Sequence, residues 1–213
     1  MGAISLIRHG QASWDSDDYD QLSDLGQRQA GWLGLAWEAG GLRPTWSVAG
    51  SLKRHAQTAV GAIDAIDGDL YDVDPGWNEY DHLALVNMSA ATERPADPKE
   101  FQALLDGALE RWVAGEVSAG GESFVQFSAR VLASLETAVA RAGSGQHVAV
   151  FTSGGPIAAA ASHLLAGDAS LFITLNRIVV NASITTVMVG RSGTRLLTFN
   201  EHGHIPRDAV TFR

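Results

Sequence analysis

The apolar and polar positions along the chain alternate between short β-rich runs and longer segments with helical spacing. The first run, Ala3–Ile7, is mainly apolar and breaks at Arg8, as a buried strand does where it enters a loop. Ser23 stands where it can cap a helix of about 15 residues, which Gly40 and Gly41 then end. The start of the chain therefore predicts a strand, a loop and a helix, in that order.

The next part of the chain repeats this pattern. Trp46–Ala49 predicts a second strand, and Ser51 is expected to cap a helix that runs from Leu52 to about Ile66. Asp69–Val73 predicts a third strand. The stretch Pro75–Pro98 has no clean periodicity, and we expect an irregular excursion or lid there, with a part in substrate specificity.

The second half of the chain completes an α/β pattern. Apolar residues recur at helical spacing from Glu122 to Arg141 and predict a long helix that packs on the sheet. His147–Thr152 predicts a central strand and Pro156–Leu165 the helix after it. Ile184–Val189 and Thr194–Asn200 predict a closing hairpin. Strands that alternate with helices indicate a mostly parallel central sheet covered on both faces, a three-layer α/β/α sandwich.

Length and composition agree with one folded unit. The chain has 213 residues, 46% apolar and 18% charged, and we expect a single domain over residues 1–213. It contains no cysteine, which excludes disulfides and thiol nucleophiles and fits a reducing compartment. The sequence begins with no secretion signal, and no apolar run reaches the length of a membrane helix. We therefore expect a cytoplasmic protein without membrane contact.

The net charge of −9 limits the possible partners. Lysine occurs only at positions 53 and 99, so the chain lacks the clustered cations that a nucleic-acid backbone demands. Nucleic acid is therefore excluded as an expected partner. An anionic ligand has to bind at a small local group of arginines.

Two segments supply such a group together with a nucleophile. Arg8-His9-Gly10 places an imidazole and a guanidinium at the end of the first strand. A neutral imidazole attacks phosphorus well, and a guanidinium holds phosphate oxygens in a fork. Arg54 lies in the first turn of the helix after the second strand, which faces the same edge of a parallel sheet.

Five short segments, taken in order, resemble those of the histidine phosphatase (phosphoglycerate mutase-like) superfamily: Leu6–Gly10, Leu22–Ala30, Ser51–Ala59, Gly121–Ser123 and Gly154–Gly155. The resemblance runs from residue 4 to about residue 204. It implies that His9 takes up the phosphoryl group and that Arg8 and Arg54 bind it. It also implies that Gly10, Gln11 and Ser13 line the same pocket.

The leaving-group oxygen needs a proton as the P–O bond breaks. The family places a glutamate after the third strand, and Glu79 occupies that position, with Asp81 as a rival close in sequence. Neighbouring side chains are candidates for lining the substrate pocket, namely Trp77, Tyr80 and His82.

The sequence departs from the family at Ser153. The family's second histidine stands directly before the Gly-Gly pair, and here serine precedes Gly154. Losing one donor to a transferring phosphoryl group typically costs about 10²–10³ in rate. Ser153 and Gly154 are nevertheless expected to bind phosphate, because Ser153 can cap the helix that opens at Pro156 and its hydroxyl can still donate. His55, His82 and His204 remain open as compensating groups.

The resemblance implies a metal-independent phosphomonoesterase that acts through phosphohistidine on a small organic phosphate ester, with no cofactor. A mutase-type phosphotransferase is one alternative. The other is a catalytically weak phosphate-binding or regulatory module, which the serine at position 153 keeps open. The pair His202 and His204 invites a metal site but lacks a third ligand at a recognised spacing, so no metal is expected. A homodimer is compatible with the sequence.

Overall fold

The computed structural model describes residues 1–13, 20–66, 68, 71–87 and 98–212. Its centre is a six-stranded sheet in the order β3-β2-β4-β1-β5-β6. β1 (Gly2–Arg8) and β2 (Trp46–Ala49) pair in parallel with the two sides of β4 (His147–Thr152). β3 (Asp72–Val73) continues the parallel part beyond β2. The predicted central position of the strand at 147–152 is confirmed.

The other side of the sheet is antiparallel. β5 (Ile184–Gly190) runs against β1, and β6 (Gly193–Glu201) runs against β5. The two strands form the predicted hairpin, in which Gly193 adopts a positive φ of 108°. The sheet is therefore mixed, and β1, which ends at Arg8, joins its parallel part to its antiparallel part.

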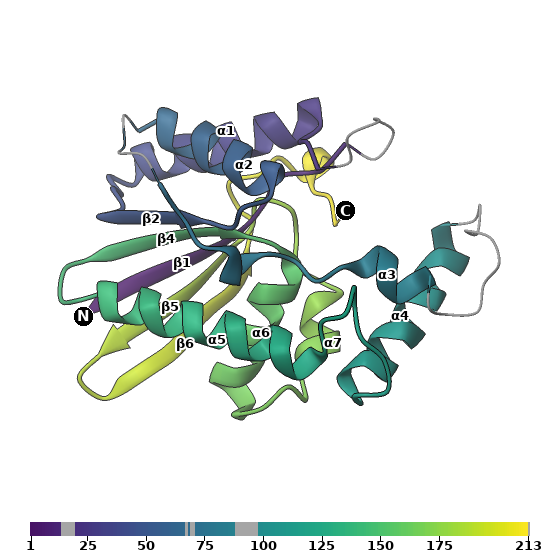
Figure 1. Cartoon of the computed structure of the whole chain (residues 1–213). Coiled ribbons are helices and arrows are strands. Elements are labelled where there is room, and N and C mark those ends of the chain that lie inside the picture. The colour runs from purple at the N-terminus through teal and green to yellow at the C-terminus, as the bar shows by residue number, and fades with distance from the viewer. Residues whose placement is uncertain (14–19, 67, 69–70, 88–97, 213) are drawn as a thin grey trace.

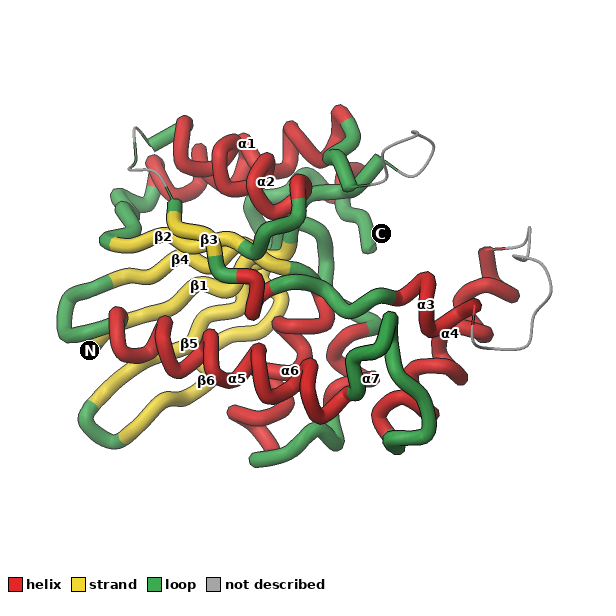
Figure 2. The backbone as a smooth tube through the Cα atoms, viewed as in Figure 1, coloured by secondary structure: helices red, strands yellow, loops and turns green. Residues whose placement is uncertain are grey.

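Helices cover both faces of the sheet, as the pattern predicted. Figure 1 and Figure 2 show α1 (Asp24–Ala39) and α2 (Lys53–Asp64) on one face, and α5 (Phe124–Arg141) and α6 (Gly154–Ala166) on the other. Strand residues that point in opposite directions join separate apolar clusters. Ile7, Ala49 and Phe151 pack with α1 and α2. Leu6, Val48 and Val150 pack with α5 and α6. These alternating positions hold the three layers together.

Two helix starts carry serine caps, of which the one at Ser23 was predicted. Ser23 accepts a hydrogen bond from the N–H of Gly26 at the start of α1. Ser123 and Gln126 form a reciprocal capping box at the start of α5. The prediction for Ser51 was wrong, because α2 begins at Lys53, one residue later than expected, with Leu52 in the cap position.

The segment that follows β3 is more helical than its sequence indicated. It contains a 3₁₀ turn, η1 (Pro75–Trp77), and a short helix, α3 (His82–Asn87), whereas residues 88–97 lie outside the described part. The prediction of an irregular excursion was therefore wrong for residues 82–87, because a turn and a half of helix is too short to show a period. α4 (Pro98–Val113) follows, and Figure 1 shows α3 and α4 together, on the side toward which β1 runs.

Two shorter elements complete the described chain. α7 (Phe172–Asn176) follows α6, and a 3₁₀ turn, η2 (Arg207–Ala209), lies near the end. Neither was predicted, since both are too short for periodicity to detect. No helix in the part of the chain described here is long and apolar enough to cross a membrane.

Candidate active site

His9 directly follows β1 and is held through its backbone by two other segments. Its N–H donates to the carbonyl of Thr152 at 2.8 Å, next to the end of β4. Its carbonyl accepts from Asn181 Nδ2 at 3.1 Å and from the N–H of Ala182 at 3.2 Å. The buried Asn181 thus positions the loop of His9.

The imidazole of His9 is fixed in one tautomer. Nδ1 lies 2.7 Å from the carbonyl oxygen of Gly10, which can only accept, so Nδ1 carries the hydrogen. Burial lowers the pKa of His9 well below its usual value, and the charges of Arg54 and Arg8 lower it further. His9 is therefore neutral, with the lone pair of Nε2 available for attack on an electrophile.

Gly10 has a structural role in the loop after His9. Its N–H donates to Thr58 Oγ1 at 3.1 Å, so it is not offered to a phosphate. A Cβ on Gly10 would lie 2.4 Å from the carbonyl oxygen of Gly26 in α1. Glycine is required because two backbone segments meet at this point, and the part of Gly10 in the phosphate pocket stays a prediction.

Arg8 is anchored from the far end of the chain. Its Nη1 donates to the carbonyl oxygens of Val179 and Phe212. The guanidinium also lies beside the start of α6, because a Cβ on Gly154 would be 3.8 Å from Arg8 Nε. Arg8 therefore reaches from β1 to the N-terminus of α6.

Arg54 lies in the first turn of α2 and is 8% exposed. Its Nη1 donates to Asp20 Oδ1 at 2.7 Å, and Asp20 Oδ2 accepts from the N–H of Lys53 at 2.8 Å. Asp20 therefore does at the start of α2 what Ser51 was expected to do, and it orients Arg54 as well.

Glu79 lies at the N-terminus of α6. Its Oε2 accepts from the N–H of Gly155 at 3.3 Å, and its Oε1 accepts from the N–H of Tyr80 at 3.2 Å. Desolvation raises the pKa of the Glu79 carboxyl, although Arg54 and Arg8 act in the opposite direction. A raised pKa favours the protonated form of the carboxyl, which is the form that can act as a general acid.

Asp81, the rival acid, is used elsewhere. Its Oδ1 accepts from the N–H of Ala84 at 2.9 Å and so caps the start of α3. The side chain also approaches Gly120, where a Cβ would lie 3.1 Å from Asp81 Oδ2. Glu79 is therefore the acid that contacts α6 beside Arg8 and Arg54.

Ser153 is the cap residue of α6, but its hydroxyl makes no capping bond. The helix begins at Gly154, two residues before the predicted start at Pro156. Ser153 Oγ lies 2.7 Å from Nε2 of His55, and both side chains are fully buried. The expectation that Ser153 caps the helix through its side chain was therefore wrong, because His55 binds the hydroxyl instead.

The three histidines that could compensate for the missing second histidine lie in different surroundings. The ring of His55 lies 5.8 Å from the ring of His9, between centroids. His204 Nε2 donates to the carbonyl of Ala182 at 3.0 Å, which is a structural contact. His82 is half-buried at the start of α3. The sequence did not favour His55 over the other two histidines. Its position beside Arg54, in the first turn of a helix, was the signal that could have done so.

The aromatic candidates for the substrate pocket are packed in the core. Trp77 is 1% exposed, and its contribution near the site is its carbonyl, which accepts from Thr152 Oγ1 at 2.6 Å. Tyr80 is 6% exposed, stacks against Trp112 and receives a hydrogen bond from Asn176. The burial of Trp77 argues against the prediction that it contacts substrate, whereas the ring of Tyr80 packs against Gly155 at the start of α6.

The two polar loop candidates are bound to neighbouring segments. Gln11 Oε1 accepts from the hydroxyl of Ser23 at 2.8 Å, and the N–H of Gln11 donates to Gln29. The N–H of Ser13 donates to the carbonyl of Gln21. Both residues therefore brace the loop that follows His9.

The histidine pair near the end of the chain is also engaged. His202 Nδ1 donates to the carbonyl of Asn200 at 2.6 Å, and His204 binds Ala182. Within the described ranges, no three His, Asp or Glu side chains gather as metal ligands.

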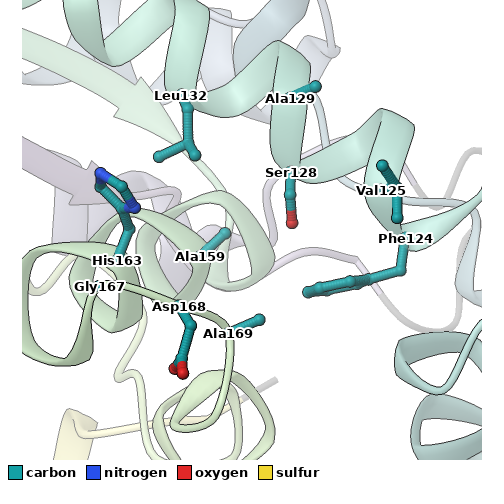
Figure 3. A pocket seen from close by; sticks show the side chains of 10 residues that line it. All are labelled: Phe124, Val125, Ser128, Ala129, Leu132, Ala159, His163, Gly167, Asp168 and Ala169. Carbon is teal, nitrogen blue, oxygen red and sulfur yellow. The ribbon is translucent and has the colours of Figure 1, made fainter.

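A separate hollow of about 360 Å³ opens between α5 and α6. Figure 3 shows that its walls come from Phe124–Leu132 and from Ala159–Ala169. Most of these side chains are apolar, and His163 and Asp168 border one end. Its α6 residues, Ala159 and His163, lie at least one helical turn beyond Gly155, and none of its lining residues belongs to the site around His9.

Comparisons with solved structures agree with the architecture. A mycobacterial glucosyl-3-phosphoglycerate phosphatase is 23% identical with a TM-score of 0.67, over 94% of this chain and 99% of that one. A phosphoserine phosphatase mutant from Entamoeba histolytica is 19% identical with a TM-score of 0.71, over 97% of this chain and 100% of that one. A second mycobacterial hydrolase is 22% identical with a TM-score of 0.69, over 97% of this chain and 94% of that one.

These likenesses establish the fold. A search of curated proteins gave no match. The family model of the histidine phosphatase superfamily, branch 1, matches residues 4–202, from within β1 to just past the end of β6. The matched range includes Arg8, His9, Arg54, Glu79 and Ser153. The chain belongs to the histidine phosphatase superfamily, branch 1.

Proposed function

We propose that the protein is a metal-independent phosphomonoesterase that acts on small organic phosphate esters through a phosphohistidine intermediate. The observation that carries this proposal is the state of His9: its Nδ1 hydrogen is bound to the carbonyl of Gly10, and its neutral Nε2 lies near Arg8 and Arg54. Family membership and the phosphatases among its structural neighbours support the same activity.

The first step transfers the phosphoryl group to the protein. His9 Nε2 forms a bond to phosphorus while the bond from phosphorus to the ester oxygen breaks. The carboxyl group of Glu79 gives its proton to the departing oxygen, so the product leaves as an alcohol. Arg8 and Arg54 neutralise the charge on the phosphoryl oxygens, and we propose that they do so without a metal ion.

The second step regenerates the protein. Water attacks phosphorus of phospho-His9, the P–N bond breaks, and the electron pair returns to Nε2. The carboxylate of Glu79 takes the proton of the water, which restores the acid for the next cycle. Inorganic phosphate then leaves the arginines.

The experiment that tests this function combines His9→Ala with trapping of the intermediate. The wild-type protein should hydrolyse a generic aryl phosphate and, after rapid quenching, carry acid-labile phosphate. His9→Ala should lose both properties and keep its melting temperature. A chelator should leave the wild-type rate unchanged. Full activity in His9→Ala would refute the proposal, and a rate that depends on an added divalent ion would refute its metal-independent form.

The two alternatives have distinct outcomes in the same assay. A mutase would move phosphate between positions of one substrate with little release of inorganic phosphate. A phosphate-binding module would bind phosphate without any turnover. The cytoplasmic location and the homodimer stay predictions.

A further inference from the structure

We infer that His55 is a positioning residue for phosphoryl transfer: it holds the hydroxyl of Ser153 so that this hydroxyl donates its hydrogen to the transferring phosphoryl group. The inference rests on the proposed function and adds a donor to it. It starts from the 2.7 Å contact between His55 Nε2 and Ser153 Oγ.

The contact joins the two faces of the molecule at the site. His55 belongs to α2, and Ser153 directly precedes α6, which Figure 1 shows on the opposite face of the sheet. Both side chains are buried, and a hydrogen bond is electrostatically stronger in such surroundings than in water. The bond therefore links the helix start that carries Arg54 with the helix start that contacts Glu79.

The backbone on both sides of Ser153 contacts the reacting groups, and the ring of its partner His55 lies 5.8 Å from the ring of His9, between centroids. The carbonyl of Thr152, just before it, accepts from the N–H of His9. Gly154, just after it, lies beside the guanidinium of Arg8. The N–H of Gly155 donates to Glu79.

The number of hydrogens available to His55 and Ser153 determines which of the two donates in their contact. A phosphoryl oxygen can only accept a hydrogen bond, so a hydroxyl that binds it must donate its single hydrogen to that oxygen. The hydrogen in the contact with Ser153 must then come from Nε2 of His55. This tautomer leaves Nδ1 of His55 as a bare lone pair, which needs no acceptor.

The surroundings of Nδ1 fit that tautomer. It is buried and has no hydrogen-bond partner in the described part of the chain. It lies against the backbone of Gly50, where a Cβ would approach it to 2.3 Å. An N–H in this place would be a buried donor without an acceptor, which proteins rarely tolerate. Burial and Arg54 also lower the pKa of His55, which keeps the ring neutral.

A second histidine–serine pair provides a matched control. His147 Nε2 lies 2.8 Å from Ser5 Oγ, where β4 begins beside β1, away from the strand ends that carry His9. This pair has the same chemistry but lies outside the site. His147→Gln therefore reports what the loss of such an imidazole costs the fold alone.

The test compares Ser153→Ala, His55→Leu, His55→Gln and the double variant Ser153→Ala/His55→Leu. Ser153→Ala and His55→Leu should each lower kcat for an aryl phosphate by about 10²-fold, the low end for one donor to developing charge. KM should change little, because the bond is made chiefly to the transition state. The double variant should be no slower than Ser153→Ala, because His55 acts through Ser153. His55→Gln should recover most of the rate, since its amide can still donate to Oγ, and His147→Gln should match the wild type.

Orthovanadate binding is the readout that does not depend on turnover. Ser153→Ala and His55→Leu should weaken it at least tenfold, while inorganic phosphate binding changes less. Additive losses in the double variant, or unchanged kcat and vanadate affinity in a folded His55→Leu, would overturn the inference. Activity retained in His9→Ala would instead refute the proposed function, so the two failures are distinguishable.

Discussion

The guanidinium of Arg130 binds both carboxylate oxygens of Glu122, at 2.6 and 3.0 Å. The same guanidinium donates through Nη1 to the carbonyl oxygens of Gly76, at 2.9 Å, and Asn78, at 2.7 Å. Asn78 directly precedes Glu79 in the chain. The ion pair of Arg130, on α5, with Glu122, just before that helix, therefore holds the loop that presents the proposed acid.

Arg130→Met should misplace that loop. We expect kcat to fall roughly tenfold with little change in KM, because small displacements of a proton donor are costly. The free energy of unfolding should fall by about 1–3 kcal/mol through the lost hydrogen bonds. Steady-state kinetics and urea unfolding measure both. Arg141→Met, at the exposed end of the same helix, is the control and should change neither value by a comparable amount.

The pH dependence of kcat/KM should report the ionisation of the Glu79 carboxyl. In the proposed mechanism its acid form is the active one, and the raised pKa extends that form upward in pH. The rate should therefore fall as pH rises through the pKa of Glu79. Glu79→Gln should abolish this limb and lower the rate for alkyl phosphates by about 10²–10⁴, with a smaller effect on aryl phosphates, whose leaving groups need less protonation.

Asp81→Asn is the matched control for that experiment, because Asp81 caps α3. It should keep the wild-type pH profile. A profile in which the limb disappears in Asp81→Asn and persists in Glu79→Gln would reverse the assignment of the acid.

Protein stability should fall on acidification partly through His55. Its pKa is lowered in the folded protein, so below the usual histidine pKa of about 6.5 the unfolded chain binds more protons. The stabilisation is fully present above that pH and is lost as the pH falls toward the folded pKa. When the pH falls from 7.5 to 5, the free energy of unfolding should decrease by about 1–2 kcal/mol less in His55→Gln than in the wild type. Urea unfolding at both pH values tests this, with the exposed His163→Gln as control, and equal losses would contradict it.

Ser153→His should not raise activity, although a histidine there would match the family pattern. The imidazole of His55 already fills the space beside Ser153, and both residues are fully buried. A second ring should overpack the site, lower the free energy of unfolding by about 1–3 kcal/mol and leave kcat unchanged or lower. His55→Ala/Ser153→His makes room for the new ring and should be faster than Ser153→His alone. A single variant faster than the wild type would contradict the packing argument.

Much of the fold was predictable from local pattern. The strand at Trp46–Ala49 and the strand at His147–Thr152 have the predicted bounds, because each is a buried run broken by loop residues. The helix that begins after Ser23 was predicted from its cap and from Gly40. The short elements were missed, since five or six residues give no period.

For the site, the sequence by itself determined which residue types stand at the ends of the parallel strands. His9 and Arg8 follow one strand, and Arg54 and Glu79 follow two others, so a parallel sheet with helices after its strands brings them to one edge. That inference needs only the order of elements along the chain.

Only the tertiary structure decided which partner each group has. Nothing in the sequence indicated that Asp20 would bind Arg54, or that His55 would meet Ser153 from the opposite side of the sheet. These pairs lie 34 and 98 residues apart, and a hydrogen bond depends on distances of tenths of an ångström. Packing of α2 and α6 against the two faces of one sheet sets those distances, and no local pattern of residues encodes them.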